Sequence, residues 1–283
     1  MRTLMSVVAS VLVLTTHGSL AQDLATADLA EIDRKLNNPL TDIWSLTFQN
    51  NTAVKRGDSI DGADSTNSLF FQPFMPFEVG PDAATMVTLR PVFPLATQPV
   101  FTPEEPRTSS SHETGLGDIQ LLTLAGPNRA EGMVWGAGLT FKFPSATEDI
   151  LGQGKYQAGP ALMLFYNGEP WVGGLLLQHW ESYAGDSDRP DTRQTDLQYI
   201  VRRSIPGAAS VGMGPTITVV WEADDDNLLT LPIGLGITKT VRWGKMPVKL
   251  RAEAHYSLVR PEDYGTDWNF RLQITPVIPH PFK

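Results

Sequence analysis

The sequence predicts an all-β fold, an antiparallel transmembrane barrel of about 12 strands with an apolar exterior facing lipid and a polar lumen. Three observations predict it. Apolar and polar residues alternate over segments of roughly ten residues, the length that a tilted strand needs to cross a bilayer. Long and short connections alternate between these segments. The polar face also carries charges that a soluble barrel would have to bury at high cost.

The N-terminus, residues 1–21, has the pattern of a secretory signal peptide. Arg2 precedes an apolar stretch from Leu4 to Leu14, and Ser19 and Ala21 form a small-x-small cleavage site. This stretch is too short to span a bilayer as a stable helix. No second run of apolar residues is long enough for a helical span.

Residues 22–38 do not alternate, and we expect a periplasmic or plugging segment ahead of a barrel that occupies residues 39–283. Leu29 and Ile32 have helical spacing, and Asp28 can cap the N-terminus of a short helix. A leader without regular structure is the alternative.

Twelve segments of the remaining chain alternate with a period of two. In the last one, Trp268, Phe270 and Leu272 alternate with Asn269 and Arg271, so the two sets lie on opposite faces of a strand. Closing such strands into a barrel leaves no unpaired edge in lipid. The other segments are centred on 44–49, 66–77, 85–95, 115–125, 133–143, 155–166, 171–183, 193–203, 210–221, 228–239 and 248–256.

Every second connection is long and polar, which is typical of the outer loops of an outer-membrane barrel. These loops together hold 18 acidic and 5 basic residues. Such a negative rim suits bridging by divalent cations to lipopolysaccharide, and a solvated surface without a partner is the alternative. The predicted loops are 51–65, 96–114, 144–154, 184–192, 222–227 and 259–267.

Six tryptophans near strand ends predict an aromatic girdle at the two membrane interfaces, where an indole is half apolar and half hydrogen-bonded. Ordinary core tryptophans are the alternative. The predicted girdle is Trp44, Trp135 and Trp171 at the periplasmic end, and Trp180, Trp221 and Trp268 at the outer end.

The alternation also assigns polar side chains to the lumen and to a solute path, with more basic than acidic groups among them. We expect a weak preference for anions, because a charged ring in a low-dielectric wall selects by sign. A ladder of ion pairs that stiffens the wall is the alternative. The predicted residues are Arg90, Asp118, Lys142, Gln178, Asp196, Gln198, Arg202, Lys249, Arg251, Glu253, His255, Asn269, Arg271 and Gln273.

Composition and motifs argue against several classes of function. The chain has no cysteine, and its net charge of −9 makes nucleic acid an unsuitable partner. It lacks the G-x-S-x-G elbow of many hydrolases, and no pair of histidines has zinc spacing. We therefore expect no enzyme activity, no metal site and no cofactor.

Several stretches together resemble one bacterial family. They are LNNPLTDIWSLTFQNN at 36–51, GLGDIQ at 115–120, WGAGLTFKFPSATEDILGQGKYQAGPA at 135–161, AGDSDR at 184–189 and WEAD at 221–224. The chain resembles the outer-membrane barrels grouped under the MetA pathway of phenol degradation, often labelled simply "transporter" or, misleadingly, neuromedin U. The resemblance implies an outer-membrane barrel that passes small molecules, aromatic ones among them, and implies no catalytic residues. The terminal Lys283 departs from the aromatic residue that ends many such barrels.

These observations together predict a monomeric channel or transporter of the bacterial outer membrane, through which small solutes, aromatic or anionic, pass down their own gradient. A barrel plugged by its loops or by residues 22–38, with a structural or binding role, is the alternative. A soluble periplasmic barrel with its apolar face inward is a third reading.

Overall fold

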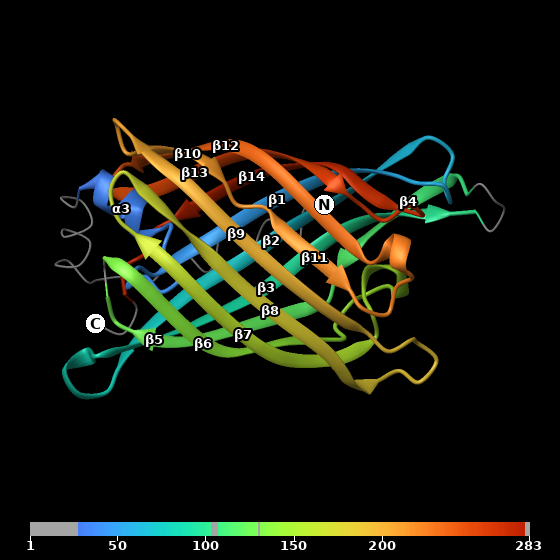
Figure 1. The fold of residues 1–283 in the computed structure, drawn as a ribbon, viewed down its shortest axis with the longest axis horizontal. Coiled ribbons are helices and arrows are strands. Elements are labelled where there is room, and N and C mark those ends of the chain that lie inside the picture. The colour runs from blue at the N-terminus through green and yellow to red at the C-terminus, as the bar shows by residue number, and fades with distance from the viewer. Residues whose placement is uncertain (1–27, 103–106, 130, 281–283) are drawn as a thin grey trace.

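The computed structural model describes residues 28–102, 107–129 and 131–280, which form a closed antiparallel barrel of 12 strands (Figure 1). The predicted signal peptide, residues 1–21, lies outside the described residues. Among the helices of the described chain, none combines the length and the apolar character that a membrane span requires.

Fourteen strand segments make up the 12 strands of the wall, because β4 and β5 are two parts of one strand, and so are β10 and β11. In the described residues, three single-turn 3₁₀ helices lie in the connections, at Pro81–Ala83, Asp149–Leu151 and Asp225–Asn227. The strands are β1 (Ser45–Arg56), β2 (Ala63–Val79), β3 (Thr85–Phe101), β4 (Ser109–Leu116), β5 (Ile119–Pro127), β6 (Gly132–Phe143), β7 (Lys155–Asn167), β8 (Trp171–Gly185), β9 (Arg193–Ile205), β10 (Ala209–Met213), β11 (Thr216–Val220), β12 (Leu229–Trp243), β13 (Met246–Val259) and β14 (Gly265–Pro276).

The barrel closes where the first strand meets the last. Phe48 of β1 pairs with Ile274 of β14, and the register continues to Arg56 opposite Gly265 with one irregularity. All neighbouring strands are antiparallel, and β12 pairs with β10 and β11 on one side and with β13 on the other. The backbone groups of the wall are therefore hydrogen-bonded within the barrel, as lipid requires.

The outer face is apolar, which confirms the predicted orientation of the strands. On β14, Trp268, Phe270 and Leu272 are 42%, 47% and 61% exposed, as expected for side chains that face lipid. The rings of Phe48 and Phe71, on adjacent strands, stack on this face with centroids 5.1 Å apart.

Two of the predicted loops are wrong in their bounds, because the strands extend further than the apolar pattern. Residues 51–65 belong largely to β1 and β2, and residues 96–114 largely to β3 and β4. Polar side chains continue the pairing there, since Asn67 Nδ2 donates to Thr52 Oγ1 at 2.8 Å across the two strands. A strand that leaves the membrane no longer needs an apolar face, so alternation underestimates its length.

The predicted helix is present as α3 (Leu29–Lys35), which lies at the end of the barrel where the short turns are found (Figure 1). Asp28 caps it by accepting a hydrogen bond from the backbone N–H of Ala30 at 3.0 Å. Ile32 and Asp33 are its buried residues. The assignment of residues 22–38 and 39–283 as separate domains stays a prediction.

Part of the barrel interior is a hydrophobic core, which the sequence pattern did not predict. Leu40, from the segment that precedes β1, is 2% exposed and packs among the inward-facing apolar residues of β3 and β5–β9. Gly126 and Gly136 make room for it, because a Cβ atom at either position would lie 2.8 or 2.9 Å from Leu40 Cδ1. The segment that precedes β1 is thus held against the wall by the packing of Leu40, in addition to the ion pair between Asp33 and Lys249.

Candidate functional site: the lumen

The lumen holds a cavity of about 500 Å³. Inward-facing side chains of β1–β3, β5, β8, β9 and β11–β14 line it, together with residues of the segment that runs from Leu36 to Thr41. The cavity is therefore enclosed by most of the barrel wall and by the N-terminal segment. Ten of the predicted lumen residues line it: Arg90, Gln178, Asp196, Gln198, Lys249, Arg251, His255, Asn269, Arg271 and Gln273.

Basic side chains outnumber carboxylates in the lining of this cavity. Its lining includes five basic side chains, Lys55, Arg90, Lys249, Arg251 and Arg271, but one carboxylate, that of Asp196. Asp196 accepts hydrogen bonds from Gln194 Nε2 at 2.8 Å and from Thr218 Oγ1 at 3.0 Å, and pairs with none of the five basic groups within the described chain.

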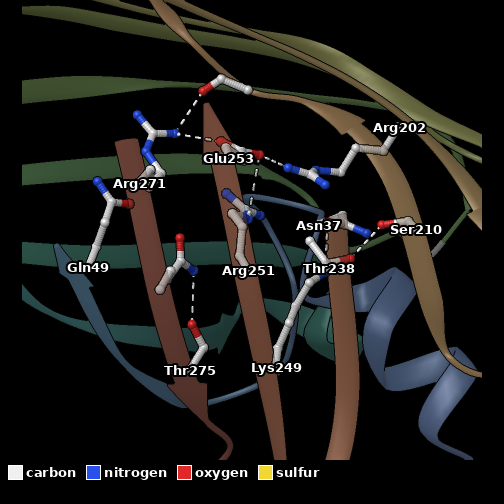
Figure 2. Close-up of polar contacts among 12 residues, drawn as sticks. Asn37, Gln49, Arg202, Ser210, Thr238, Lys249, Arg251, Glu253, Arg271 and Thr275 are labelled. Atoms are coloured by element: carbon white, nitrogen blue, oxygen red, sulfur yellow. Dashed lines mark hydrogen bonds and ion pairs between the residues drawn. The ribbon is translucent and has the colours of Figure 1, made fainter. Parts of the chain in front are cut away.

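Glu253 is the centre of a buried cluster on β13 (Figure 2). Its carboxylate forms an ion pair with Arg202 and lies 3.3 Å from Arg271 Nη1, 3.1 Å from His255 Nε2 and 3.9 Å from Arg251 Nε. Arg202 and Glu253 are themselves fully buried and do not line the cavity. Three arginines thus share one carboxylate, and the cluster keeps an excess of positive charge.

The arrangement agrees with both expectations for the lumen charges. The pair of Arg202 and Glu253 joins β9 to β13 across β10 and β12, as the ion-pair ladder would require. Arg251 and Arg271 reach the cavity surface, as the solute path would require.

Glycines on β10 and β12, the strands between β9 and β13, leave room for these large side chains against the wall. A Cβ at Gly236 of β12 would lie 2.5 Å from Glu253 Cγ, and a Cβ at Gly212 of β10 would lie 2.9 Å from Arg202 Cγ. A Cβ at Gly234 would likewise collide with the ring of His255. The charged cluster therefore lies flat against a strip of bare backbone.

Lys249 holds the N-terminal segment. Its ammonium group lies 3.3 Å from Asp33 Oδ1 and donates to the Asp33 carbonyl oxygen at 2.9 Å and to Asn37 Oδ1 at 2.7 Å. Asp33 also accepts a hydrogen bond from Thr240 Oγ1 at 2.8 Å. Alternation predicts the inward position of Lys249 but not its partners Asp33 and Asn37, because no local pattern links a short helix to strands more than 200 residues away.

Two predicted lumen residues have structural partners that keep them away from the cavity. Asp118 lies at the break between β4 and β5 and accepts hydrogen bonds from the backbone N–H groups of Ala146 and Gln153, at 3.3 and 2.7 Å. Lys142 faces inward, with its Nζ 4.1 Å from the centroid of the Trp180 ring. Neither side chain lines the cavity, so their place on the solute path stays a prediction.

Four of the six girdle tryptophans are exposed at strand ends, namely Trp135, Trp171, Trp221 and Trp268, at 42–56%. The assignment of Trp180 to the girdle is wrong, because it shares the inward parity of β8 with Gln178 and is 1% exposed. Trp44 is also misassigned: it is 6% exposed, with the rings of Phe77 and His280 against it at centroid distances of 5.3 Å.

Hydrogen bonds between outer loops connect them into a rim. The backbone N–H of Asp58 donates to the Glu262 carbonyl oxygen at 2.8 Å, which joins the β1–β2 and β13–β14 connections.

A hydrogen bond from Lys155 lowers the pKa of the exposed Asp191 carboxyl. Across the described part of the chain, no group of three or more His, Asp or Glu side chains is placed to hold a metal ion.

Comparison with known proteins gives a structural likeness without a sequence match. Neither a family model nor a curated protein matches the sequence. A solved structure described as the COG4313 outer membrane channel from Pseudomonas putida F1 is similar with a TM-score of 0.62, at 14% identity over 83% of this chain and 94% of that one.

Two other solved structures are more distant. One is the β domain of the Bordetella autotransporter BrkA, with a TM-score of 0.44 at 10% identity over 84% of this chain and all of that one. The other is outer membrane phospholipase A from Escherichia coli, with a TM-score of 0.38 at 9% identity over 94% of this chain and all of that one. The closed barrel, its apolar outer face and the fold it shares with an outer membrane channel identify a protein of the bacterial outer membrane.

Proposed function

We propose that this barrel is a passive channel for small solutes and that it prefers anions. The single observation that carries the proposal is the charge of the lumen cavity, which five basic side chains and one carboxylate line. A low-dielectric wall strengthens the attraction of such a surface for anions and repels cations. No step of this passage needs a cofactor or a catalytic group, because the solute gradient supplies the driving force.

The plugged barrel is the second candidate, and a specific contact favours it. The segment from Asp33 to Leu40 is bound to the wall by Lys249 and by the pocket around Leu40. Residues Leu36–Pro39 and Thr41 line the cavity, so this segment narrows the path at the periplasmic end. In a plugged barrel, this segment stays in place and blocks the lumen, and the protein has a structural or binding role.

Several finer assignments belong to the same proposal. The resemblance of the quoted sequence stretches to the MetA-pathway barrels supports membership of that family and makes aromatic solutes the first to test. The 18 acidic residues of the predicted outer loops support bridging by divalent cations to lipopolysaccharide. We further propose a monomer, because a single chain closes the whole barrel.

The test is single-channel recording of the purified, detergent-folded protein in a planar bilayer under a salt gradient. Discrete steps with a reversal potential on the anion side support the proposed channel. Steps of equal permeability for potassium and chloride refute the anion preference. A folded and inserted protein without steps favours the plugged barrel.

A further inference from the structure

Two guanidinium groups in the cavity have donors without a protein acceptor. Within the described chain, Arg90 forms neither an ion pair nor a side-chain hydrogen bond, and its buried Nε has no acceptor. The Nε of Arg251 also lacks a hydrogen bond, and its nearest carboxylate oxygen, on Glu253, is 3.9 Å away and shared with Arg202. A guanidinium held away from bulk water without an acceptor costs free energy that an anion from solution can offset.

Four apolar side chains line the same cavity as these donors. Val92 follows Arg90 by two residues on the inward face of β3, and Phe70 and Phe74 line the cavity from the adjacent strand β2. Ile200 lines it from β9. An inorganic anion would leave this surface exposed to water, whereas an organic anion could cover it.

We propose that the cavity contains a saturable binding site for a small organic carboxylate, whose head group binds Arg90 and Arg251 and whose apolar body lies against Val92, Phe70, Phe74 and Ile200. The planar fork of a guanidinium matches the two oxygens of a carboxylate. The cavity of about 500 Å³ lies within the size range of sites for small molecules. The site deepens the proposed anion preference and rests on it, but it makes the additional claim of a discrete, occupied position.

Isothermal titration calorimetry of the full-length protein, folded in a non-ionic detergent, tests the site. The probes are hexanoate, the neutral hexanamide of similar shape, and inorganic phosphate. We expect saturable binding of hexanoate at one site per chain, and at least about tenfold weaker binding of hexanamide and of phosphate, since one lacks the charge and the other the apolar body.

The variants Arg90→Gln and Arg251→Gln each weaken hexanoate binding by about tenfold, because each removes a charged donor. Arg203→Gln is the matched control, since it removes one positive charge at an exposed arginine of β9 that points away from the lumen and does not line the cavity. We expect a change of less than about twofold from this control. Retention of the barrel is checked by the heat-dependent shift of each variant on a denaturing gel.

Equal affinity for hexanoate and hexanamide, or for hexanoate and phosphate, would overturn the proposal. So would equal effects of Arg90→Gln and Arg203→Gln. Because calorimetry in detergent does not depend on conduction, the two proposals fail separately. Hexanoate binding without channel steps refutes the channel alone, and anion-preferring steps without saturable hexanoate binding refute the site alone.

Discussion

Asp33→Asn should release the N-terminal segment from the barrel wall. The Asp33 side chain is 5% exposed, and its loss of charge leaves the Lys249 ammonium, 1% exposed, without a counterion. Breaking a buried ion pair from one side typically costs about 3–5 kcal/mol. Lys249 keeps two neutral acceptors, the Asp33 carbonyl oxygen and Asn37 Oδ1. We therefore expect a smaller cost, about 2–3 kcal/mol, to fall on the docked state.

A cost of this size shifts the ratio of released to docked segment by roughly 30- to 160-fold, since about 1.4 kcal/mol corresponds to a factor of ten. The assay is limited proteolysis of the N-terminal segment in folded, reconstituted protein, together with the mean single-channel conductance. Asp33→Asn should be cleaved faster and should conduct more, because the segment lines the cavity.

Asp42→Asn is the matched control, since Asp42 is an exposed acid of the same segment and lies 3.1 Å from Lys35 Nζ. An exposed pair of this kind contributes less than about 1 kcal/mol, so cleavage and conductance should stay near those of the unmodified protein. If the two variants behave alike, or if Asp33→Asn stays protected while the barrel is folded, the buried ion pair does not hold the segment.

Three further results are expected. Glu253→Gln should lower the free energy of unfolding by about 3 kcal/mol or more in a urea titration, because it leaves buried arginines without their carboxylate; an unchanged midpoint would contradict the role of the cluster. Brominated lipid should quench the fluorescence of a single-tryptophan variant that keeps Trp135 but not of one that keeps Trp180, and equal quenching would contradict the inward placement of Trp180. The hydrogen bond from Lys155 lowers the pKa of Asp191 in the folded state. The contact therefore stabilises the loop fully at a pH above the ordinary aspartate pKa of about 4, and this stabilisation is lost as the pH falls through the lowered pKa. Hydrogen exchange of the loop should therefore rise in acid in the unmodified protein, and an equal rise in Asp191→Asn would contradict this reasoning.

The fold could be predicted because a transmembrane strand must obey two local rules, alternation and length. Trp268, Phe270 and Leu272 face lipid for the same reason that Asn269 and Arg271 face the lumen, and both sets are visible in a single stretch of sequence. Local rules lose force where the membrane ends. The strands beyond Asn50 and Thr97 continue through polar pairing, which resembles loop sequence.

The site could be predicted only in part, because parity gives the face of a residue and not its partner. Arg202 and Arg271 share the same parity, yet Arg202 is fully buried against Glu253 while Arg271 reaches the cavity. Trp180 shows that the position of a residue along a strand is a weaker guide than its parity. Its position near a strand end suggested an interface, but parity already placed it inside, and the inward parity was the better guide.

The bare backbone at Gly212, Gly234 and Gly236 has a consequence for how this pore could change. Its free width on that side depends on positions that carry no side chain, since the arginine, glutamate and histidine of the cluster occupy the space left there. One added methyl group at any of these positions would also lie 2.0–2.5 Å from a backbone carbonyl oxygen of the neighbouring strand, so it would disturb the strand pairing as well as the charged side chain. Variation at these glycines would therefore change the wall and the charged cluster together, although none of the three lines the cavity.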